Sequence, residues 1–171
     1  IKNKNILEKN KEILQRILTL LSIDKDLKEF IFSPTTGRGN VIKLHGSEII
    51  DQTYNAHPDT VIATAMEEDS NNTILVLGDM AELGEGAAHL HGDLAAKVDA
   101  ADIDLVITCG ALMQNLHDAL PAGRLGMHAD NHRDALSILR RELHGDDVVM
   151  VKGSNASRMG LVVDGLIMLT K

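Results

Sequence analysis

The chain has 171 residues, of which 44% are hydrophobic and 25% are charged; this is enough to bury one normal core and excludes a disordered chain. With no tryptophan, one tyrosine and two phenylalanines, a surface that stacks on nucleic-acid bases or sugars is not expected. The formal charge of −8 is uneven, because residues 1–43 hold nine Lys and Arg against five Asp and Glu, and residues 44–171 hold eight against twenty. The acidic body is therefore a poor partner for nucleic acid or a membrane surface, since neutralising phosphates needs clustered cations.

Cys109 is the single cysteine, which excludes a disulfide framework and a cysteine-based zinc site and fits a cytoplasmic protein. No apolar run approaches membrane-spanning length, so no membrane insertion is expected. The chain starts at Ile1 inside a helical pattern, without an initiator Met. We therefore expect it to be a piece of something larger.

The first part of the chain is predicted to be helical. Residues 5–22 carry apolar side chains at helical spacing among Lys, Glu and Gln, and a second short helix is predicted over 24–31. The turn-rich stretch 33–39 then indicates a domain seam. We expect residues 1–36 to be the helical tail of a preceding domain or a linker, and 37–171 to be the main domain.

Beyond the seam, apolar runs of strand length alternate with helical patterns, which predicts βαβ units and a mainly parallel sheet. Only His45 and Gly46 separate the first two runs, so these two strands should form a hairpin with an antiparallel edge strand. The expected fold is α/β, a Rossmann-like three-layer sandwich of about six strands behind an N-terminal helical leader. Strands are predicted near 40–44, 47–51, 73–77, 104–108, 124–128 and 147–151, and helices near 58–68, 87–100, 111–119, 131–143 and 155–169.

Three polar segments each follow an apolar strand, and the carboxyl ends of parallel strands are where ligands bind. The first, Asp51–Asp59, reads D-Q-T-Y-N-A-H-P-D. A well-capped turn explains Pro58 and Asn55. However, the segment contains more polar residues than a turn requires. We therefore keep two interpretations, a capped turn and a ligand-binding segment.

The second segment, Gly78–Glu85, reads G-D-M-A-E-L-G-E and is followed by His89 and His91. It is interpreted either as a solvated acidic loop or as a loop that orients a substrate amine. A metal site is the weaker reading, because two histidines in a His-x-His pattern on a helix point to different faces.

The third segment, Lys152–Asn155, reads K-G-S-N. An ammonium group, backbone donors and a helix N-terminus in one place favour a carboxylate or a phosphate. The alternative is an N-cap at Ser154 beside an exposed lysine. The remaining candidates are weaker. Cys109 is predicted to be a small buried hydrophobic residue. Four scattered histidines are predicted to lie at the surface or at helix ends: His117, His128, His132 and His144.

These segments, in this order and spacing, resemble the carboxyl-terminal domain of the Mur ligases, in the branch that adds D-alanyl-D-alanine during peptidoglycan synthesis. The resemblance rests on G-R-G at Gly37–Gly39, D-Q-T-Y-N-A-H-P at Asp51–Pro58, V-L-G-D-M-A-E-L-G-E at Val76–Glu85 with His91, and V-K-G-S at Val151–Ser154. It covers about residues 37 to 169, and residues 1–36 match poorly.

The resemblance implies ATP-dependent amide bond formation. The tripeptide carboxylate of UDP-N-acetylmuramoyl-tripeptide becomes an acyl phosphate, which the amine of D-alanyl-D-alanine attacks. ATP and Mg²⁺ would be held mainly by a central domain that this chain lacks, since the chain contains no G-x-x-x-x-G-K-[ST] phosphate loop. The chain alone is expected to be inactive, with its own N-terminal and central domains as partners and no catalytic residue of its own.

Position by position, the resemblance implies nucleotide contacts by Arg38, Asp51, Tyr54, Asn55 and His57. It implies that Lys152, Ser154 and Asn155 face the dipeptide carboxylate, and that Asp79 and Glu82 help to position the incoming ammonium. No metal-binding residue is expected.

Two residues depart from the family pattern, which usually has a second acid at the position of Gln52 and Asn at that of His57. A second hypothesis is therefore kept, a free-standing α/β module that binds an amino acid or a nucleotide without chemistry. A dinucleotide-dependent enzyme is disfavoured, because no G-x-G-x-x-G follows the first parallel strand.

Overall fold

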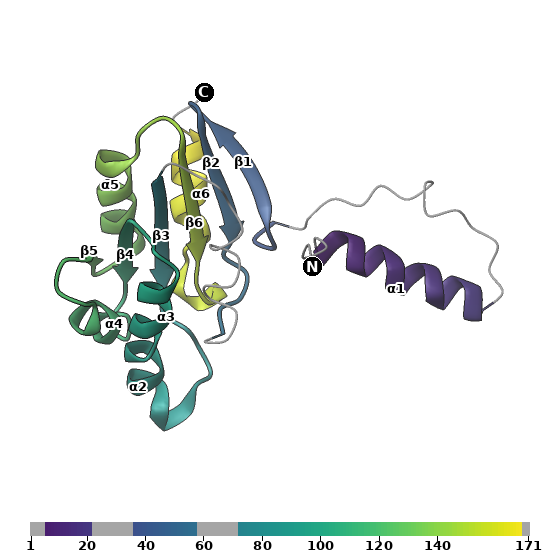
Figure 1. The fold of residues 1–171 in the computed structure, drawn as a ribbon, viewed down its shortest axis with the longest axis horizontal. Coiled ribbons are helices and arrows are strands. Elements are labelled where there is room, and N and C mark those ends of the chain that lie inside the picture. Colours follow the sequence, from purple (N-terminus) through teal and green to yellow (C-terminus); the bar gives the residue numbers. More distant parts are fainter. Residues whose placement is uncertain (1–5, 22–35, 58–71, 169–171) are drawn as a thin grey trace. The chain divides into compact units, whose positions relative to one another are not determined.

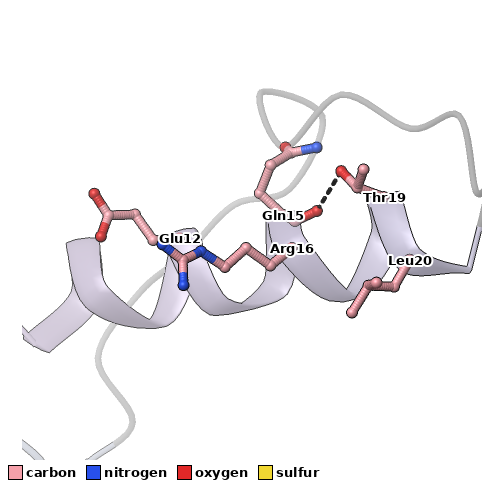
Figure 2. Close-up of a pocket in the computed structure, with 5 residues that line it drawn as sticks. All are labelled: Glu12, Gln15, Arg16, Thr19 and Leu20. Carbon is pink, nitrogen blue, oxygen red and sulfur yellow. Dashed lines mark hydrogen bonds between the residues drawn. The ribbon is translucent and has the colours of Figure 1, made fainter.

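The computed structural model describes residues 6–21, 36–57 and 72–168. The chain divides into two compact units, residues 1–34 and 35–171, each of which is described by itself. In the first unit, α1 (Ile6–Leu20) is the amphipathic helix predicted there. Figure 2 shows the side chains of Glu12, Gln15, Arg16, Thr19 and Leu20 on this helix. The Thr19 hydroxyl donates to the carbonyl of Gln15 at 2.9 Å.

The second unit is built on one six-stranded sheet (Figure 1). The strand order is β1-β2-β6-β3-β4-β5, and every neighbouring pair is parallel except β1 and β2. His45 and Gly46 both have positive φ, which fits the twist of a two-residue hairpin turn. The prediction of a mainly parallel sheet with an antiparallel edge strand is confirmed. The strands are β1 (Asn40–Leu44), β2 (Ser47–Gln52), β3 (Asn72–Gly78), β4 (Leu105–Cys109), β5 (Leu125–Ala129) and β6 (Asp147–Lys152).

Helices cover both faces of this sheet and complete the three layers (Figure 1). One face packs against α5 (His132–Glu142) and α6 (Gly160–Ile167). The other packs against α3 (Leu94–Ala100) and α4 (Gln114–Ala119), with α2 (Ala87–Gly92) beside them. Because β3, β4 and β6 are covered on both sides, their sequences are almost continuously apolar rather than alternating.

Two predicted helices have different bounds in the structure. The helix expected over 87–100 is interrupted at Asp93, next to Gly92, which has poor helix propensity. The helix expected from residue 155 starts at Gly160, because Arg158 has a left-handed φ of 56°. The intervening η4 (Asn155–Ser157) is a 3₁₀ turn. The helices predicted over 24–31 and 58–68 lie outside the described residues.

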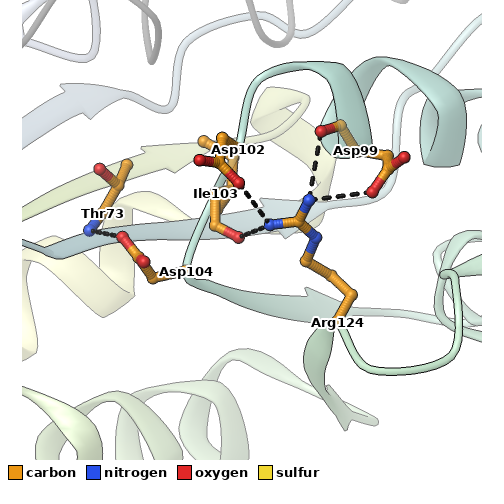
Figure 3. A network of polar contacts seen from close by, with 6 residues as sticks. All are labelled: Thr73, Asp99, Asp102, Ile103, Asp104 and Arg124. Carbon is orange, nitrogen blue, oxygen red and sulfur yellow. Dashed lines mark hydrogen bonds and ion pairs between the residues drawn. The ribbon is translucent and has the colours of Figure 1, made fainter.

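Arg124, just before β5, is linked to the segment between α3 and β4 by the contacts that Figure 3 shows. Its guanidinium donates to the Asp99 carboxylate at 2.9 Å, to the Asp102 carboxylate at 3.3 Å and to the Ile103 carbonyl at 2.8 Å. The hydrogen bonds to the two carboxylates raise the pKa of Arg124 further above its ordinary value. These contacts lie just before β4 and β5, whereas the polar segments follow β2, β3 and β6.

Candidate functional site

The strand order places the three polar segments next to one another. β6 lies between β2 and β3 and is parallel to both, so all three strands end at the same edge of the sheet. Gln52 pairs with Lys152, and Lys152 pairs with Leu77. The residues that follow these strands therefore form one composite surface at the carboxyl edge, where open α/β sheets bind ligands.

Asp51 holds the glycine-bounded turn that carries Arg38. Its buried carboxylate accepts from the Gly37 N–H at 2.9 Å, the Thr53 hydroxyl at 2.7 Å and the Thr53 N–H at 3.2 Å. The Gly39 N–H also donates to the Asp51 carbonyl at 2.7 Å. Three of about four acceptor positions on the carboxylate are thus used within the chain, so Asp51 fixes the turn and has little capacity left for a ligand.

Arg38 and Tyr54 form a stacked pair on this turn. The guanidinium carbon lies 3.9 Å from the centroid of the Tyr54 ring, which is cation–π geometry. Tyr54 is 52% exposed, so the pair presents a flat cationic surface to solvent. Asn55 and His57 are also exposed, on the segment that follows Tyr54.

Lys152 is the buried cation of the site, with only 5% of the residue exposed. Its ammonium donates to the Gln52 side-chain oxygen at 3.0 Å and to the Asn55 carbonyl at 3.2 Å. Burial lowers the pKa of this ammonium, and among the described residues no carboxylate pairs with it. The alternative of an exposed lysine is wrong. A buried charge with neutral partners only is costly, and an anionic ligand would offset that cost.

Ser154 and Asp79 join the ends of β6 and β3. The Asp79 carbonyl accepts from the Ser154 N–H at 3.1 Å and from its hydroxyl at 2.7 Å. One oxygen of the Asp79 carboxylate accepts from the Met113 N–H at 2.8 Å. Ser154 also caps η4 by accepting from the Ser157 N–H at 3.3 Å. The other oxygen of the Asp79 carboxylate receives no described hydrogen bond.

Glu82 and Asn155 lie at the rim of the composite surface. Glu82 is exposed on the loop after Asp79, with a left-handed φ of 63°. Asn155 is exposed and lines a shallow hollow of about 360 Å³ together with Arg158. Thr53, Gly160, Leu161 and Asp164 complete the lining. The structure does not join either residue to Lys152 by a described hydrogen bond.

His91 is a further functional candidate, for which the sequence indicated no role beyond its place in the His-x-His pattern and in the family motif. It is fully buried, and its Nε2 lies 2.9 Å from the Met80 N–H while its Nδ1 lies 2.6 Å from the Ala87 carbonyl. His89 instead faces solvent and pairs with Asp93 at 3.4 Å, as expected for rings on different faces. In the described part of the chain, no group of three or more His, Cys, Asp or Glu is placed to hold a metal ion.

The interpretation of Cys109 as a buried packing residue agrees with the structure. Cys109 is buried, and burial together with the charges of Asp79, Asp134 and Asp130 raises the pKa of its thiol to about 12. Met80, Met150 and Met159 are also buried in the core. Within the described ranges, no helix is both long enough and apolar enough to cross a bilayer.

Solved structures share this fold. The crystal structure of a MurF ligase from Thermotoga maritima in complex with ADP matches with a TM-score of 0.72 and 24% identity, covering 88% of this chain and 35% of that one. A MurF from Acinetobacter baumannii matches with a TM-score of 0.74 and 20% identity, covering 89% of this chain and 36% of that one. The fold is therefore the α/β domain that these MurF ligases contain.

Sequence comparison identifies the family. Residues 37–155 match the Mur ligase, glutamate ligase domain. The UDP-N-acetylmuramoyl-tripeptide–D-alanyl-D-alanine ligase of Mycobacterium bovis is 35% identical over 147 residues, covering 71% of this chain and 29% of that protein. That of Bacillus subtilis is 28% identical over 130 residues, covering 71% and 28%. The chain belongs to the Mur ligase family and carries its carboxyl-terminal domain. It spans less than a third of the length of these curated relatives.

Proposed function

We propose that this chain is the carboxyl-terminal domain of an ATP-dependent ligase that adds D-alanyl-D-alanine to UDP-N-acetylmuramoyl-tripeptide in the cytoplasm, during peptidoglycan synthesis. The observation that carries the proposal is the buried Lys152 ammonium, whose partners among the described residues are neutral and which lies near Ser154 at the carboxyl edge. Such a group favours a carboxylate, the group at one end of the dipeptide. The names of the curated relatives support the same substrate.

In the proposed reaction, the γ-phosphoryl group of ATP is transferred to the tripeptide carboxylate, giving an acyl phosphate and ADP. The neutral amine of D-alanyl-D-alanine then attacks the acyl carbon, and inorganic phosphate leaves as the amide bond forms. This chain contributes binding and orientation rather than a covalent catalyst. Its closure on a preceding domain would bring amine and acyl phosphate together.

The proposed dipeptide subsite lies around Lys152. Lys152 would bind the carboxylate, with Asn155 at the rim, and Ser154 would shape the subsite, because its N–H and its hydroxyl both donate to the Asp79 carbonyl. The free carboxylate oxygen of Asp79 would accept a hydrogen bond from the dipeptide ammonium before it loses its proton. Glu82, which is exposed on the same loop, would add negative charge near that ammonium.

The proposed nucleotide subsite lies around the Arg38–Tyr54 pair. Arg38 would contact the phosphates. Tyr54, Asn55 and His57 would form the surface next to Arg38 that contacts the rest of the nucleotide. Asp51 would act mainly by holding the turn of Arg38, because its carboxylate is already hydrogen-bonded within the chain. We assign the phosphate loop and Mg²⁺ to the preceding central domain.

The test is a titration of isotope-labelled chain with D-alanyl-D-alanine and, separately, with ATP, followed by backbone amide shifts. The dipeptide should shift the amides of residues 152–155, and ATP should shift those of residues 38 and 53–57. Lys152→Met should abolish the dipeptide response and leave the ATP response intact. Dipeptide binding that survives this substitution would contradict the assigned subsite. Adding the central domain in trans separates a ligase from a binding module, since only a ligase would then turn over ATP.

A further inference from the structure

The peptide unit between Asp79 and Met80 is held from both sides. Its carbonyl accepts two hydrogen bonds from Ser154, at 3.1 Å from the N–H and 2.7 Å from the hydroxyl. Its N–H donates to Nε2 of His91 at 2.9 Å. We propose that His91 is a positioning residue which, through this one peptide unit, sets the orientation of Ser154. The inference rests on the proposed function, in which Ser154 belongs to the loop that follows Lys152 and borders the dipeptide subsite.

The hydrogen-bond partners of His91 define its tautomer. The Ala87 carbonyl can only accept, so Nδ1 of His91 carries the proton across their 2.6 Å contact. The Met80 N–H can only donate, so Nε2 of His91 must keep its lone pair. The neutral Nδ1–H tautomer satisfies both. Because His91 is fully buried, water does not substitute for either partner.

The coupling to Ser154 follows from the planarity of the peptide bond. The N–H of Met80 and the C=O of Asp79 belong to one rigid plane and point in opposite directions. An acceptor that fixes the N–H therefore also fixes the carbonyl on which both donors of Ser154 converge. If the N–H lost its buried acceptor, the plane would turn to find another partner and would carry Ser154 with it.

Two further variants test the role of His91: a control at His89, and a substitution of His91 that keeps a hydrogen-bond acceptor. His89 lies on the same short helix, is exposed and faces away from Met80, so His89→Leu is the matched control. In His91→Gln, the side-chain oxygen reaches about as far as Nε2 and can accept from the Met80 N–H. In His91→Leu, no acceptor is left at this position.

The experiment uses the isotope-labelled 171-residue chain first without ligand. Wild-type imidazole nitrogen shifts should report the Nδ1–H tautomer. His91→Leu should speed hydrogen exchange at the Met80 amide by at least about tenfold, relative to the β4 amides as internal reference, and should shift the Ser154 amide. His91→Gln should restore both signals, and His89→Leu should change neither. An Nε2–H tautomer in the wild type, or a Ser154 amide unmoved in a folded His91→Leu chain, would overturn the proposal.

A second arm adds D-alanyl-D-alanine. His91→Leu should weaken the dipeptide affinity about tenfold, the equivalent of one lost buried hydrogen bond, and His91→Gln should recover most of it. If the wild type does not bind the dipeptide, the proposed substrate fails while the ligand-free arm still decides the role of His91. If the wild type binds and His91→Leu binds equally well, the positioning role fails and the proposed function stands.

Discussion

Gly78, at the end of β3, and Gly153, just after β6, lie side by side under Ser157 and Met159, so neither has room for a side chain. A Cβ added to Gly153 would lie 3.3 Å from the Gly78 Cα, 2.4 Å from the Ser157 hydroxyl oxygen and 2.7 Å from Met159 Cγ. A Cβ on Gly78 would lie 2.4 Å from the same Met159 carbon. Because the two glycines lack side chains, Ser157 and Met159 can cover them. This places η4 against the composite surface.

Gly153→Ala should therefore destabilise the domain and displace η4. The added methyl group overpacks a position where the Ser157 and Met159 side chains leave no space, and we expect a loss of about 1–3 kcal/mol in the free energy of unfolding. Gly86→Ala is the control, because a Cβ there meets nothing within 4 Å and φ is −81°. Urea denaturation of both variants measures the difference. Equal stability of Gly153→Ala and wild type would show that the strand ends are not tightly packed.

Lys152 should make the folded state more stable as the pH rises toward 10.5. Burial lowers the pKa of its ammonium below 10.5, so between the two pKa values the unfolded chain binds more protons than the folded chain. By linkage, the free energy of unfolding then rises with pH across that window, and below it the cost of the buried charge is present in full.

Urea denaturation of wild type and Lys152→Met from pH 7 to 10.5 measures this effect. Subtracting the two series removes the titrations that both proteins share. The stability of wild type relative to Lys152→Met should increase with pH. A difference that is flat or falls with pH would mean that the ammonium is solvated in the folded chain.

Gln52→Glu should weaken binding of a carboxylate ligand. The substitution replaces the neutral acceptor at 3.0 Å from the Lys152 ammonium with a charged one, so the cation gains an internal counter-ion. We expect about tenfold weaker affinity for D-alanyl-D-alanine, from one competing ion pair. Ala122→Glu adds the same charge at an exposed turn and should leave the affinity unchanged. Calorimetric titration compares the two, and equal affinities would remove Lys152 from the carboxylate site.

Cys109 should be unreactive toward iodoacetamide while the protein is folded. Burial and nearby carboxylates raise the pKa of its thiol from 9.0 to about 12, which lowers the thiolate fraction at pH 8 about a thousandfold. Mass spectrometry should show slow alkylation in buffer and rapid alkylation in denaturing urea. Comparable rates in the two conditions would place the thiol at the surface.

The sheet could be predicted from the sequence because its signals are local. Apolar runs of strand length, such as Ile74–Leu77, and the short connection at His45 and Gly46 specify strands and a hairpin within a few residues. The polar segments could be placed at one edge because parallel strands end together. Both predictions use only neighbouring residues and a topological rule.

The contacts within the site could not be predicted in the same way. Lys152 is buried because it meets Gln52 and Asn55, which are 100 and 97 residues away in the chain. His91 reaches Met80 across a loop, and nothing in the residue types indicates which ring nitrogen accepts. The later start of α6 depends on the left-handed backbone of Arg158, a residue type that seldom adopts it.

The position of β6 has a consequence for how the domain is made. Of the six strands in the sheet, this one comes last in the sequence, yet it lies between β2 and β3, which do not pair with each other. Until residues 147–152 are in place, the β1–β2 hairpin and the β3–β4–β5 half have no shared backbone ladder. The two parts therefore keep unpaired strand edges until β6 is inserted between them, and only then does the composite surface at the carboxyl edge form.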